Sequence, residues 1–296
     1  MKKTITTRAL LAIFGSIPLA VRREIFKAIS LIIYHFSPAR RRIAIDNLRR
    51  AYPEKSAPAL IKITKGVYRN IGIVAAEFFQ IPSLTRKNIH KFVEYEGLEN
   101  YRNALAKKKG VLLLSAHFGN WELAITALAF PEQPVNFIYR PLDSPVLEDL
   151  VTYVRTCAGS KHLPKDRAMM QIFRSIKKNE MVGILIDQNM TRNEGLFVDF
   201  FGRPSCTSNG PALLALHTGA PVIPAFMVRM QNCKYRFVIG KEVELINTGN
   251  LEADIFTNTQ NFTRIIEDFI RRYPDQWLWI HQRWRTKLHQ PAAETT

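Results

Sequence analysis

The chain has 296 residues, of which 47% are hydrophobic, so it can bury a large core as one α/β domain or as a domain with a helical appendage. Its 42 lysines and arginines against 25 acidic residues give a net charge of +17, which favours a polyanionic partner: nucleic acid, an anionic membrane surface or an acidic protein. The three cysteines lie far apart without a C-x-x-C pair, which suits a reducing compartment and argues against a disulfide framework or a zinc site.

Two apolar runs open the chain, at residues 9–21 and 25–36, with Arg22, Arg23 and Glu24 between them. Neither run reaches the roughly 20 apolar residues that a membrane-spanning helix needs. Charge precedes a stretch of signal-peptide length, but no convincing small-x-small cleavage site follows it. We therefore predict that residues 1–36 form a helix, or a helical hairpin, on the membrane surface, with the cationic residues at the lipid headgroups. A single spanning anchor and an amphipathic helix packed on a soluble core remain as alternatives.

Helical spacing continues from about residue 38 to a break at Pro53, and a second helix is predicted over residues 58–79. Residues 92–96 alternate like a strand. Residues 98–109 then predict a helix, which Gly110 closes.

After residue 110 short apolar runs alternate with helical stretches. The predicted strands are residues 111–115, 135–140, 181–187, 221–228 and 235–240. The predicted helices are residues 121–129, 145–157, 166–178, 210–218 and about 255–273. This alternation predicts an α/β fold with a mixed, largely parallel central sheet flanked by helices. We expect one domain over residues 37–288 and a disordered tail over residues 289–296.

The stretch HFGNWE, from His117 to Glu122, joins a predicted strand to a predicted helix. On a continuous helix or strand, an offset of five would turn the two side chains different ways. A turn at Gly119 lets the glutamate reach back to the imidazole, fix its tautomer and stabilise it once it has taken a proton. His117 is therefore a candidate general base at the carboxyl edge of the sheet. A structural His–Glu pair is the alternative.

Several further segments carry a resemblance to a known family. HFGNWE has the H-x4-E form, FIYRPLDSP follows at residues 137–145, ILIDQN at 184–189, and QWLWIHQRWRT at 276–286. In this order the segments resemble the bacterial lipid A biosynthesis (lauroyl or myristoyl) acyltransferases, within the lysophospholipid and glycerolipid acyltransferase superfamily. The resemblance covers about residues 40–288. It implies a glycerolipid acyltransferase-like fold and an O-acyltransferase that moves a fatty acyl chain to a hydroxyl of a lipid A precursor.

The implied chemistry assigns roles to several residues. His117 would deprotonate the acceptor hydroxyl for direct attack on a thioester, and without a G-x-S-x-G elbow we expect no covalent acyl-enzyme. Backbone N–H groups near Gly119 and Asn120, at the start of a helix, are expected oxyanion donors. Arg140 is similar to the family's substrate-facing arginine and suits a phosphate or carboxylate, with a surface ion pair as its alternative.

Asp187 and Gln188 end a predicted strand on the same edge as His117. They are expected to bind acceptor hydroxyls, with a turn cap as the alternative for Asp187. We predict no metal site, because no ligand-spacing motif is present. We also expect no cofactor, since acyl carrier protein or coenzyme A brings the acyl group as a co-substrate. His281, which lies among tryptophans, is expected to be packed or interfacial.

The expected partners are acyl carrier protein, a lipid or glycolipid acceptor and an anionic membrane surface, but no nucleic acid, because no nucleic-acid-binding pattern is present. The resemblance implies acyl carrier protein as the usual donor. It also places the protein at the cytoplasmic face of the bacterial inner membrane, either peripheral or held by one N-terminal anchor. Two alternatives remain: an acyltransferase for another acceptor, such as a phosphatidylinositol mannoside or a lysophospholipid, and a non-catalytic basic membrane-binding protein.

Overall fold

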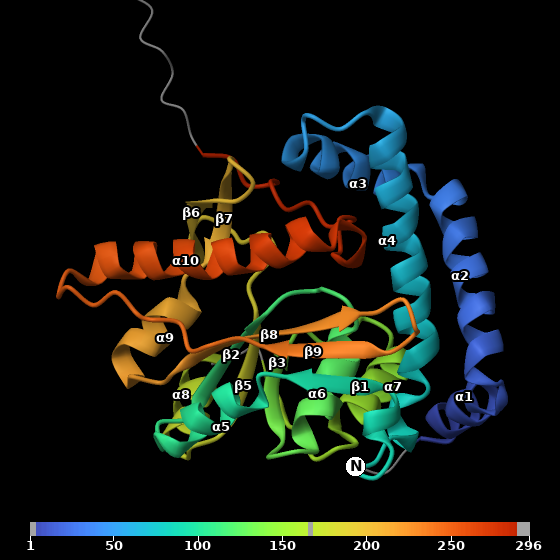
Figure 1. Ribbon diagram of the computed structural model, residues 1–296, viewed down its shortest axis with the longest axis horizontal. Helices are drawn as coiled ribbons and strands as arrows, with labels where there is room; N and C mark the ends of the chain where they lie inside the picture. Colours follow the sequence, from blue (N-terminus) through green and yellow to red (C-terminus); the bar gives the residue numbers. More distant parts are fainter. Residues whose placement is uncertain (1–3, 165–167, 289–296) are drawn as a thin grey trace, which may run out of the picture.

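The computed structural model describes residues 4–164 and 168–288, and within them a seven-stranded sheet forms the centre of the molecule (Figure 1). The strand order is β1-β9-β8-β2-β5-β3-β4. These strands are β1 (Val93–Glu96), β2 (Val111–Ser115), β3 (Val135–Tyr139), β4 (His162–Pro164), β5 (Met181–Leu185), β8 (Val222–Arg229) and β9 (Tyr235–Ile239). Neighbouring strands pair in parallel except β8 and β9, which pair antiparallel. The predicted mixed, largely parallel sheet is therefore confirmed.

Helices cover both faces of this sheet. One face packs against α5 (Leu98–Ala106), α6 (Trp121–Ala129) and α7 (Pro145–Thr156), and the other against α8 (Ala168–Lys177), α9 (Gly210–Thr218) and α10 (Leu251–Arg272). The position of β2 between the two helix layers explains why its first four residues are apolar. Leu113 faces the first of these layers and Leu112 and Leu114 face the second, so both faces of the strand are buried up to its last residue, Ser115.

The N-terminal region is helical, as predicted. It contains α1 (Ile5–Ser16), α2 (Leu19–Phe36), α3 (Pro38–Ala51) and α4 (Ala57–Phe78). Pro18 precedes α2 and separates it from α1, which contacts α7. Helix α2 lies alongside α4 (Figure 1). A Cβ atom at Gly72 of α4 would lie 2.6 Å from the carbonyl oxygen of Phe26, so the glycine allows the two backbones to approach closely.

The cationic residues between the two apolar runs do not face outward, and this part of the prediction was wrong. Arg22 is fully buried and donates to the Phe14 carbonyl and to Gln80 Oε1. Arg23 forms an ion pair with Glu77, at 2.6 Å between Nη2 and Oε1. Polar groups of α1, of α4 and of the turn that follows α4 bind these guanidinium groups in place of lipid phosphates. Within the described residues, no helix combines the length and the apolar character needed to cross a bilayer.

Two strand features were not predicted. Strand β4 has only three residues, and β6 (Gly195–Asp199) and β7 (Pro204–Ser208) form a separate antiparallel hairpin. Phe201 and Gly202 lie in the hairpin turn with φ of 55° and 70°. A phenylalanine rarely adopts that backbone conformation, so the turn lacks the sequence signal of a hairpin. The three-residue helices η1 (Ile81–Ser83), η2 (Ile89–Lys91) and η3 (Pro274–Gln276) complete the elements of the described residues. The predicted tail, residues 289–296, and the start of the helix predicted over residues 166–178 lie outside the described residues.

Candidate active site

The candidate site lies where β2 and β5 end. These strands are parallel neighbours, and Ser115 is registered with Leu185. The carboxyl ends of parallel neighbours lie at the same edge of a sheet. His117 and Asp187 each follow their strand by two residues, so the sheet places them side by side although they are 70 residues apart in sequence.

His117 and Asp187 form a close pair. Imidazole Nδ1 of His117 lies 3.0 Å from Oδ1 of Asp187, and the backbone N–H of His117 donates to Oδ2 at 3.0 Å. The indole Nε1 of Trp277 also donates to Oδ2, at 2.8 Å, and Asp187 is only 4% exposed. The carboxylate accepts a hydrogen bond from Nδ1–H, so the neutral imidazole has its proton on Nδ1 and its free lone pair on Nε2. Asp187 thus binds the candidate base and Trp277, two contacts that the sequence had not suggested.

Opposing effects set the pKa values of this pair. Burial lowers the pKa of His117, but the charge and hydrogen bond of Asp187 and the charge of Glu122 outweigh it, so the pKa is raised. Burial raises the pKa of Asp187, but His117 and the Trp277 hydrogen bond lower it to about 2. Asp187 is therefore ionised at neutral pH, and His117 is a stronger base than a free histidine.

Glu122 has a different partner from the predicted one. Its carboxylate accepts from Arg155 Nε at 2.7 Å and Nη2 at 2.6 Å, and from the Trp121 indole at 2.9 Å. Glu122 affects His117 through its negative charge. The hydrogen bond to the imidazole that we had assigned to Glu122 is made by Asp187. The prediction failed because the last turn of α7 presents a guanidinium to Glu122, which binds a carboxylate bidentately. Arg155 also lies over the Tyr139 ring, 4.8 Å from its centroid.

Gly119 and Asn120 shape the loop, and their N–H groups are not open donors. The N–H of Gly119 donates to the Gln276 carbonyl at 2.8 Å, and that of Asn120 to the Met227 carbonyl at 3.4 Å. The expected oxyanion donors are therefore already satisfied. Asn120 is fully buried and caps α6, with its Oδ1 accepting from the N–H of Leu123 at 3.0 Å.

The other two predicted ligands differ in position. Gln188 Nε2 lies 3.3 Å from His117 Nε2, so this side chain is inside the site. Arg140 follows β3 with its side chain 80% exposed, and pairs with Asp143 at 3.4 Å, which is the surface ion pair considered as its alternative. Within the described residues, no group of three or more His, Cys, Asp or Glu side chains is arranged to hold a metal ion.

A C-terminal segment, residues 276–286, holds both halves of the pair and was not predicted as part of the site. The N–H of Leu278 donates to the His117 carbonyl at 3.1 Å. His281 Nε2 accepts from the N–H of Asn189 at 3.0 Å, and Arg283 Nη1 donates to the Gln188 carbonyl at 3.2 Å. Burial lowers the pKa of His281, which keeps it neutral as this hydrogen bond requires. The three tryptophans of the segment predicted apolar packing. They did not indicate that its backbone, His281 and Arg283 make polar contacts in the site.

Characterised proteins resemble this chain over most of its length. The lipid A biosynthesis palmitoleoyltransferase of Escherichia coli (strain K12) is 29% identical over 263 residues, which cover 88% of this chain and 83% of that protein. The lipid A biosynthesis lauroyltransferase of the same organism is 25% identical, over 85% of this chain and 81% of that protein. A phosphatidylinositol mannoside acyltransferase of Mycobacterium tuberculosis (strain CDC 1551 / Oshkosh) is 24% identical, over 72% of this chain and 67% of that protein.

The sequence also matches the family of bacterial lipid A biosynthesis acyltransferases across residues 4–286. That range contains the N-terminal helices, the His117–Asp187 pair and the C-terminal segment that holds it. The chain therefore belongs to the bacterial lipid A biosynthesis acyltransferases and is an O-acyltransferase.

Proposed function

We propose that this protein transfers a fatty acyl chain from acyl carrier protein to a hydroxyl of a lipid A precursor, with His117 as the general base and Asp187 as the carboxylate that orients it. The observation that carries this proposal is the bond between His117 Nδ1 and a buried, ionised Asp187. It fixes the tautomer whose Nε2 accepts a proton.

The reaction needs one proton carrier and no covalent acyl-enzyme. The acceptor hydroxyl gives its proton to His117 Nε2 while its oxygen attacks the thioester carbonyl carbon. The tetrahedral intermediate then collapses, the C–S bond breaks, and the thiolate takes the proton back from His117. In the structure Gln188 Nε2 lies 3.3 Å from His117 Nε2, so the acceptor hydroxyl would displace it when the substrate binds.

Arg155 supplies the fixed positive charge for the oxyanion. Glu122 binds its Nε and Nη2, which leaves Nη1 to face the developing charge. Because the Gly119 and Asn120 N–H groups already donate to backbone carbonyls, a held guanidinium is the better donor in this site. The motif glutamate then has two functions: it anchors Arg155 and it raises the pKa of His117 through its charge.

The family and the relatives support the acceptor. The lipid A transferases among the relatives cover more of this chain than the phosphatidylinositol mannoside acyltransferase does. A lipid A precursor is therefore the expected acceptor, and a phosphatidylinositol mannoside is the second candidate that the similarity favours.

The outer face of α2 supports membrane association. Its large apolar side chains lie in the open at helical spacing: Val21, Ile25, Ile29, Ile32, Ile33 and Phe36. An exposed apolar face on an amphipathic helix fits the interface of a bilayer. We place the protein as a peripheral protein on the cytoplasmic face of the inner membrane, with this face of α2 in the lipid.

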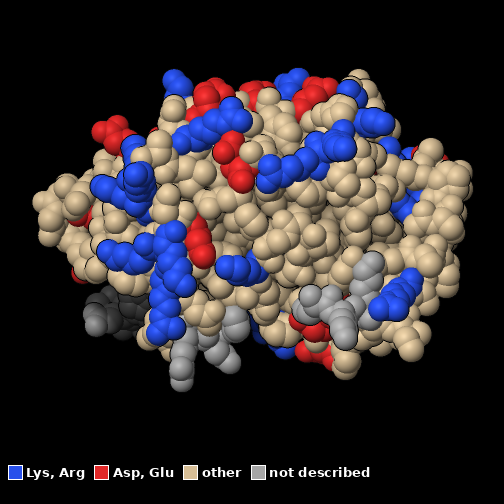
Figure 2. Space-filling view, turned by 90° about the horizontal axis from the view of Figure 1, so that it is seen from below, with Lys and Arg blue, Asp and Glu red and all other residues tan. Residues whose placement is uncertain are grey.

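The charge of the protein supports an acidic donor and an anionic surface together. Figure 2 shows basic groups spread over one face of the molecule, with acidic groups between them. On α3, Arg40, Arg42 and Arg49 are exposed next to the end of α2. Both acyl carrier protein and anionic lipid bind through such basic surfaces.

The test is an acyl-transfer assay with purified protein. Radiolabelled acyl groups are offered on acyl carrier protein or coenzyme A, to a lipid A precursor or a phosphatidylinositol mannoside. Transfer from the carrier protein to the lipid A precursor is expected, and it should fall by about 10²–10⁴-fold in His117→Ala. His217→Ala is the control, because His217 is an exposed residue near the end of α9. Near-normal turnover by His117→Ala, or a trapped acyl-enzyme, would refute the mechanism.

A further inference from the structure

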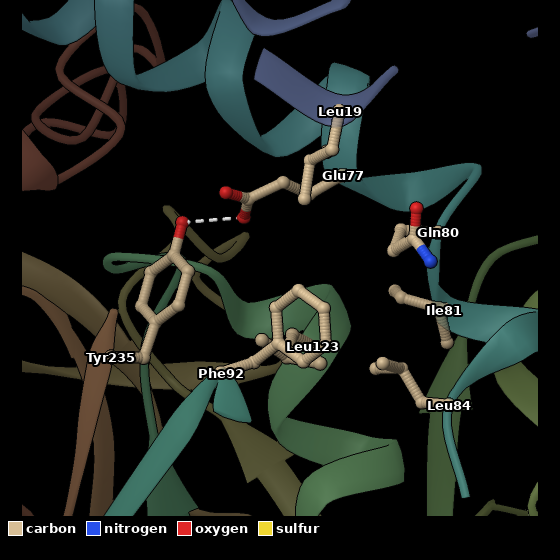
Figure 3. Close-up of a pocket in the computed structure, with 8 residues that line it drawn as sticks. All are labelled: Leu19, Glu77, Gln80, Ile81, Leu84, Phe92, Leu123 and Tyr235. Atoms are coloured by element: carbon tan, nitrogen blue, oxygen red, sulfur yellow. Dashed lines mark hydrogen bonds between the residues drawn. The ribbon is translucent and has the colours of Figure 1, made fainter. Parts of the chain in front are cut away.

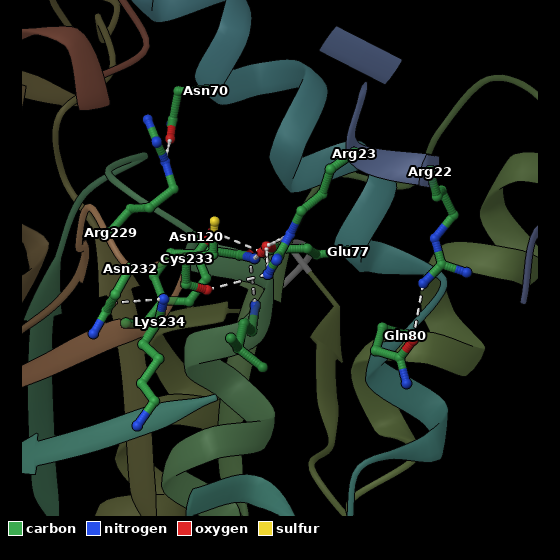
Figure 4. Close-up of polar contacts among 12 residues, drawn as sticks. Arg22, Arg23, Asn70, Glu77, Gln80, Asn120, Arg229, Asn232, Cys233 and Lys234 are labelled. Carbon is green, nitrogen blue, oxygen red and sulfur yellow. Dashed lines mark hydrogen bonds and ion pairs between the residues drawn. The ribbon is translucent and has the colours of Figure 1, made fainter. Parts of the chain in front are cut away.

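Glu77 is a buried carboxylate that joins four elements of the fold. It lies in the last turn of α4 and is 5% exposed. Its Oε1 binds Arg23 of α2, with Nε at 2.8 Å and Nη2 at 2.6 Å. Its Oε2 accepts from the Tyr235 hydroxyl of β9 at 2.6 Å (Figure 3) and from Asn120 Nδ2 at 2.7 Å (Figure 4).

The surroundings of Glu77 make these partners necessary. Apolar side chains line a small cavity beside Glu77, and Tyr235 donates directly to the carboxylate (Figure 3). They are Leu19, Ile81, Leu84, Phe92 and Leu123. A carboxylate beside such a wall needs a cation and hydrogen-bond donors from the protein itself.

The bond from Glu77 to Asn120 fixes the loop that carries His117. The two ends of the Asn120 amide have different partners: Nδ2 donates to Glu77, and Oδ1 accepts from the N–H of Leu123. Glu77 therefore determines which way the amide turns and so holds the cap of α6. The same helix turn presents Glu122 to Arg155.

The other end of this chain of contacts is the helix that we place on the membrane. Arg23 points into the protein and bonds both Glu77 and the Cys233 carbonyl (Figure 4). The neighbouring Arg22 is also turned inward. The exposed isoleucines Ile25 and Ile29 lie on the outer face of the same helix. Helix α2 thus has a lipid-facing side and a side that is bonded to the active-site loop.

We infer that Arg23 and Glu77 are positioning residues for acyl transfer, and that α2 is part of the active-site scaffold as well as a membrane contact. This inference rests on the proposed function for its catalytic readout. Loss of Arg23 leaves Glu77 as a buried anion without its ion-pair partner, and the carboxylate then moves towards solvent and releases Asn120. Helix α6 then loses its N-terminal cap, and the loop from His117 to Glu122 no longer holds the imidazole in its orientation.

The experiment compares Arg23→Met, Glu77→Gln, the double variant and the control Glu24→Gln. Glu24 lies on the same helix but is exposed and pairs only with Lys27 among the described residues. We expect Arg23→Met to lower kcat by on the order of tenfold to a hundredfold, with KM for the acceptor and binding to anionic vesicles unchanged. The double variant should recover most of the loss, because a neutral glutamine still accepts from Asn120 and Tyr235. Glu24→Gln should match the unsubstituted protein.

A second measurement does not depend on activity. Amide hydrogen exchange of residues 117–124 should be faster in Arg23→Met than in Glu24→Gln, since the N–H of Leu123 depends on the Asn120 cap. Equal exchange in the two variants overturns the inference, even if the protein has no acyltransferase activity. An unchanged kcat in folded Arg23→Met overturns it as well, and so does a double variant as impaired as the single one. Absence of transfer by the unsubstituted protein, with faster exchange in Arg23→Met, counts against the proposed function and leaves the positioning role supported.

Discussion

Asp187 holds His117 through both of its carboxylate oxygens, since Oδ1 binds the imidazole Nδ1 and Oδ2 accepts the backbone N–H, each at 3.0 Å. One buried side chain therefore sets the tautomer of the base and the position of its backbone. This arrangement leads to a prediction with a defined sign for the pH dependence.

Asp187→Asn should lower kcat/KM and move its acid limb to lower pH. The ionised carboxylate raises the pKa of His117, and the base must be neutral to act, so activity of the unsubstituted protein falls as pH drops through that raised pKa. The amide of Asn carries no negative charge, so the pKa of His117 falls. The acid limb of kcat/KM therefore moves to lower pH. The pH profile of kcat/KM measures this. Asp143→Asn, on the exposed partner of Arg140, is the control, and an acid limb that stays in place in Asp187→Asn would contradict the pairing.

Glu122 and Arg155 should behave as one unit. Each single substitution, Glu122→Gln or Arg155→Met, leaves a largely buried charge without its partner, so the double variant should lose about as much kcat as either single variant. The charges of the two residues act on His117 with opposite sign. The acid limb should therefore move to lower pH in Glu122→Gln and to higher pH in Arg155→Met. Additive losses, or shifts in the same direction, would argue against the assignment of Arg155.

Replacing Ile25, Ile29 and Ile32 together by serine should abolish vesicle binding without loss of stability. These side chains are exposed on α2, so no core cavity is created, while the apolar area available to a bilayer is lost. Vesicle flotation and thermal unfolding are the measurements. Serine at the exposed Leu251 and Phe256 of α10 provides the matched control. If high salt alone releases the unsubstituted protein from vesicles, the contact is electrostatic and this role of α2 is refuted.

Gly119→Ala should destabilise the fold by about 3 kcal/mol or more, because both its conformation and its space exclude a side chain. Gly119 has φ of +58°, and a Cβ there would lie 1.6 Å from the Met227 carbonyl oxygen. Urea unfolding measures the loss. Gly249 also has a positive φ but has nothing within 4 Å, so Gly249→Ala isolates the conformational term, of order 1 kcal/mol. Equal losses in the two variants would show that the overlap with Met227 is relieved at no cost.

The sequence predicted the elements of the fold better than their contacts. Strand β2 and helix α6 have the predicted bounds, because a continuous apolar run is followed by an asparagine that caps a helix. His117 could be found because it stands at that junction. Its hydrogen-bond partner could not, because the choice of Asp187 depends on β5 lying beside β2, and strand order is a property of the folded sheet. Arg155 gave no signal either, since one arginine in the last turn of a helix is also what the helix dipole favours.

The C-terminal segment has a consequence for the order in which the chain becomes active. Residues 276–286 supply Trp277 to Asp187 and backbone hydrogen bonds to His117 and Gly119, and they are synthesised after all the strands of the central sheet. Domains form from the N-terminal side during synthesis, so α1 and α2 are available to meet a membrane while the pair of His117 and Asp187 is still incomplete. If the proposed membrane role of α2 holds, this helix can reach the lipid surface before the site is complete. The pair of His117 and Asp187 is complete only once residues 276–286 have folded onto it.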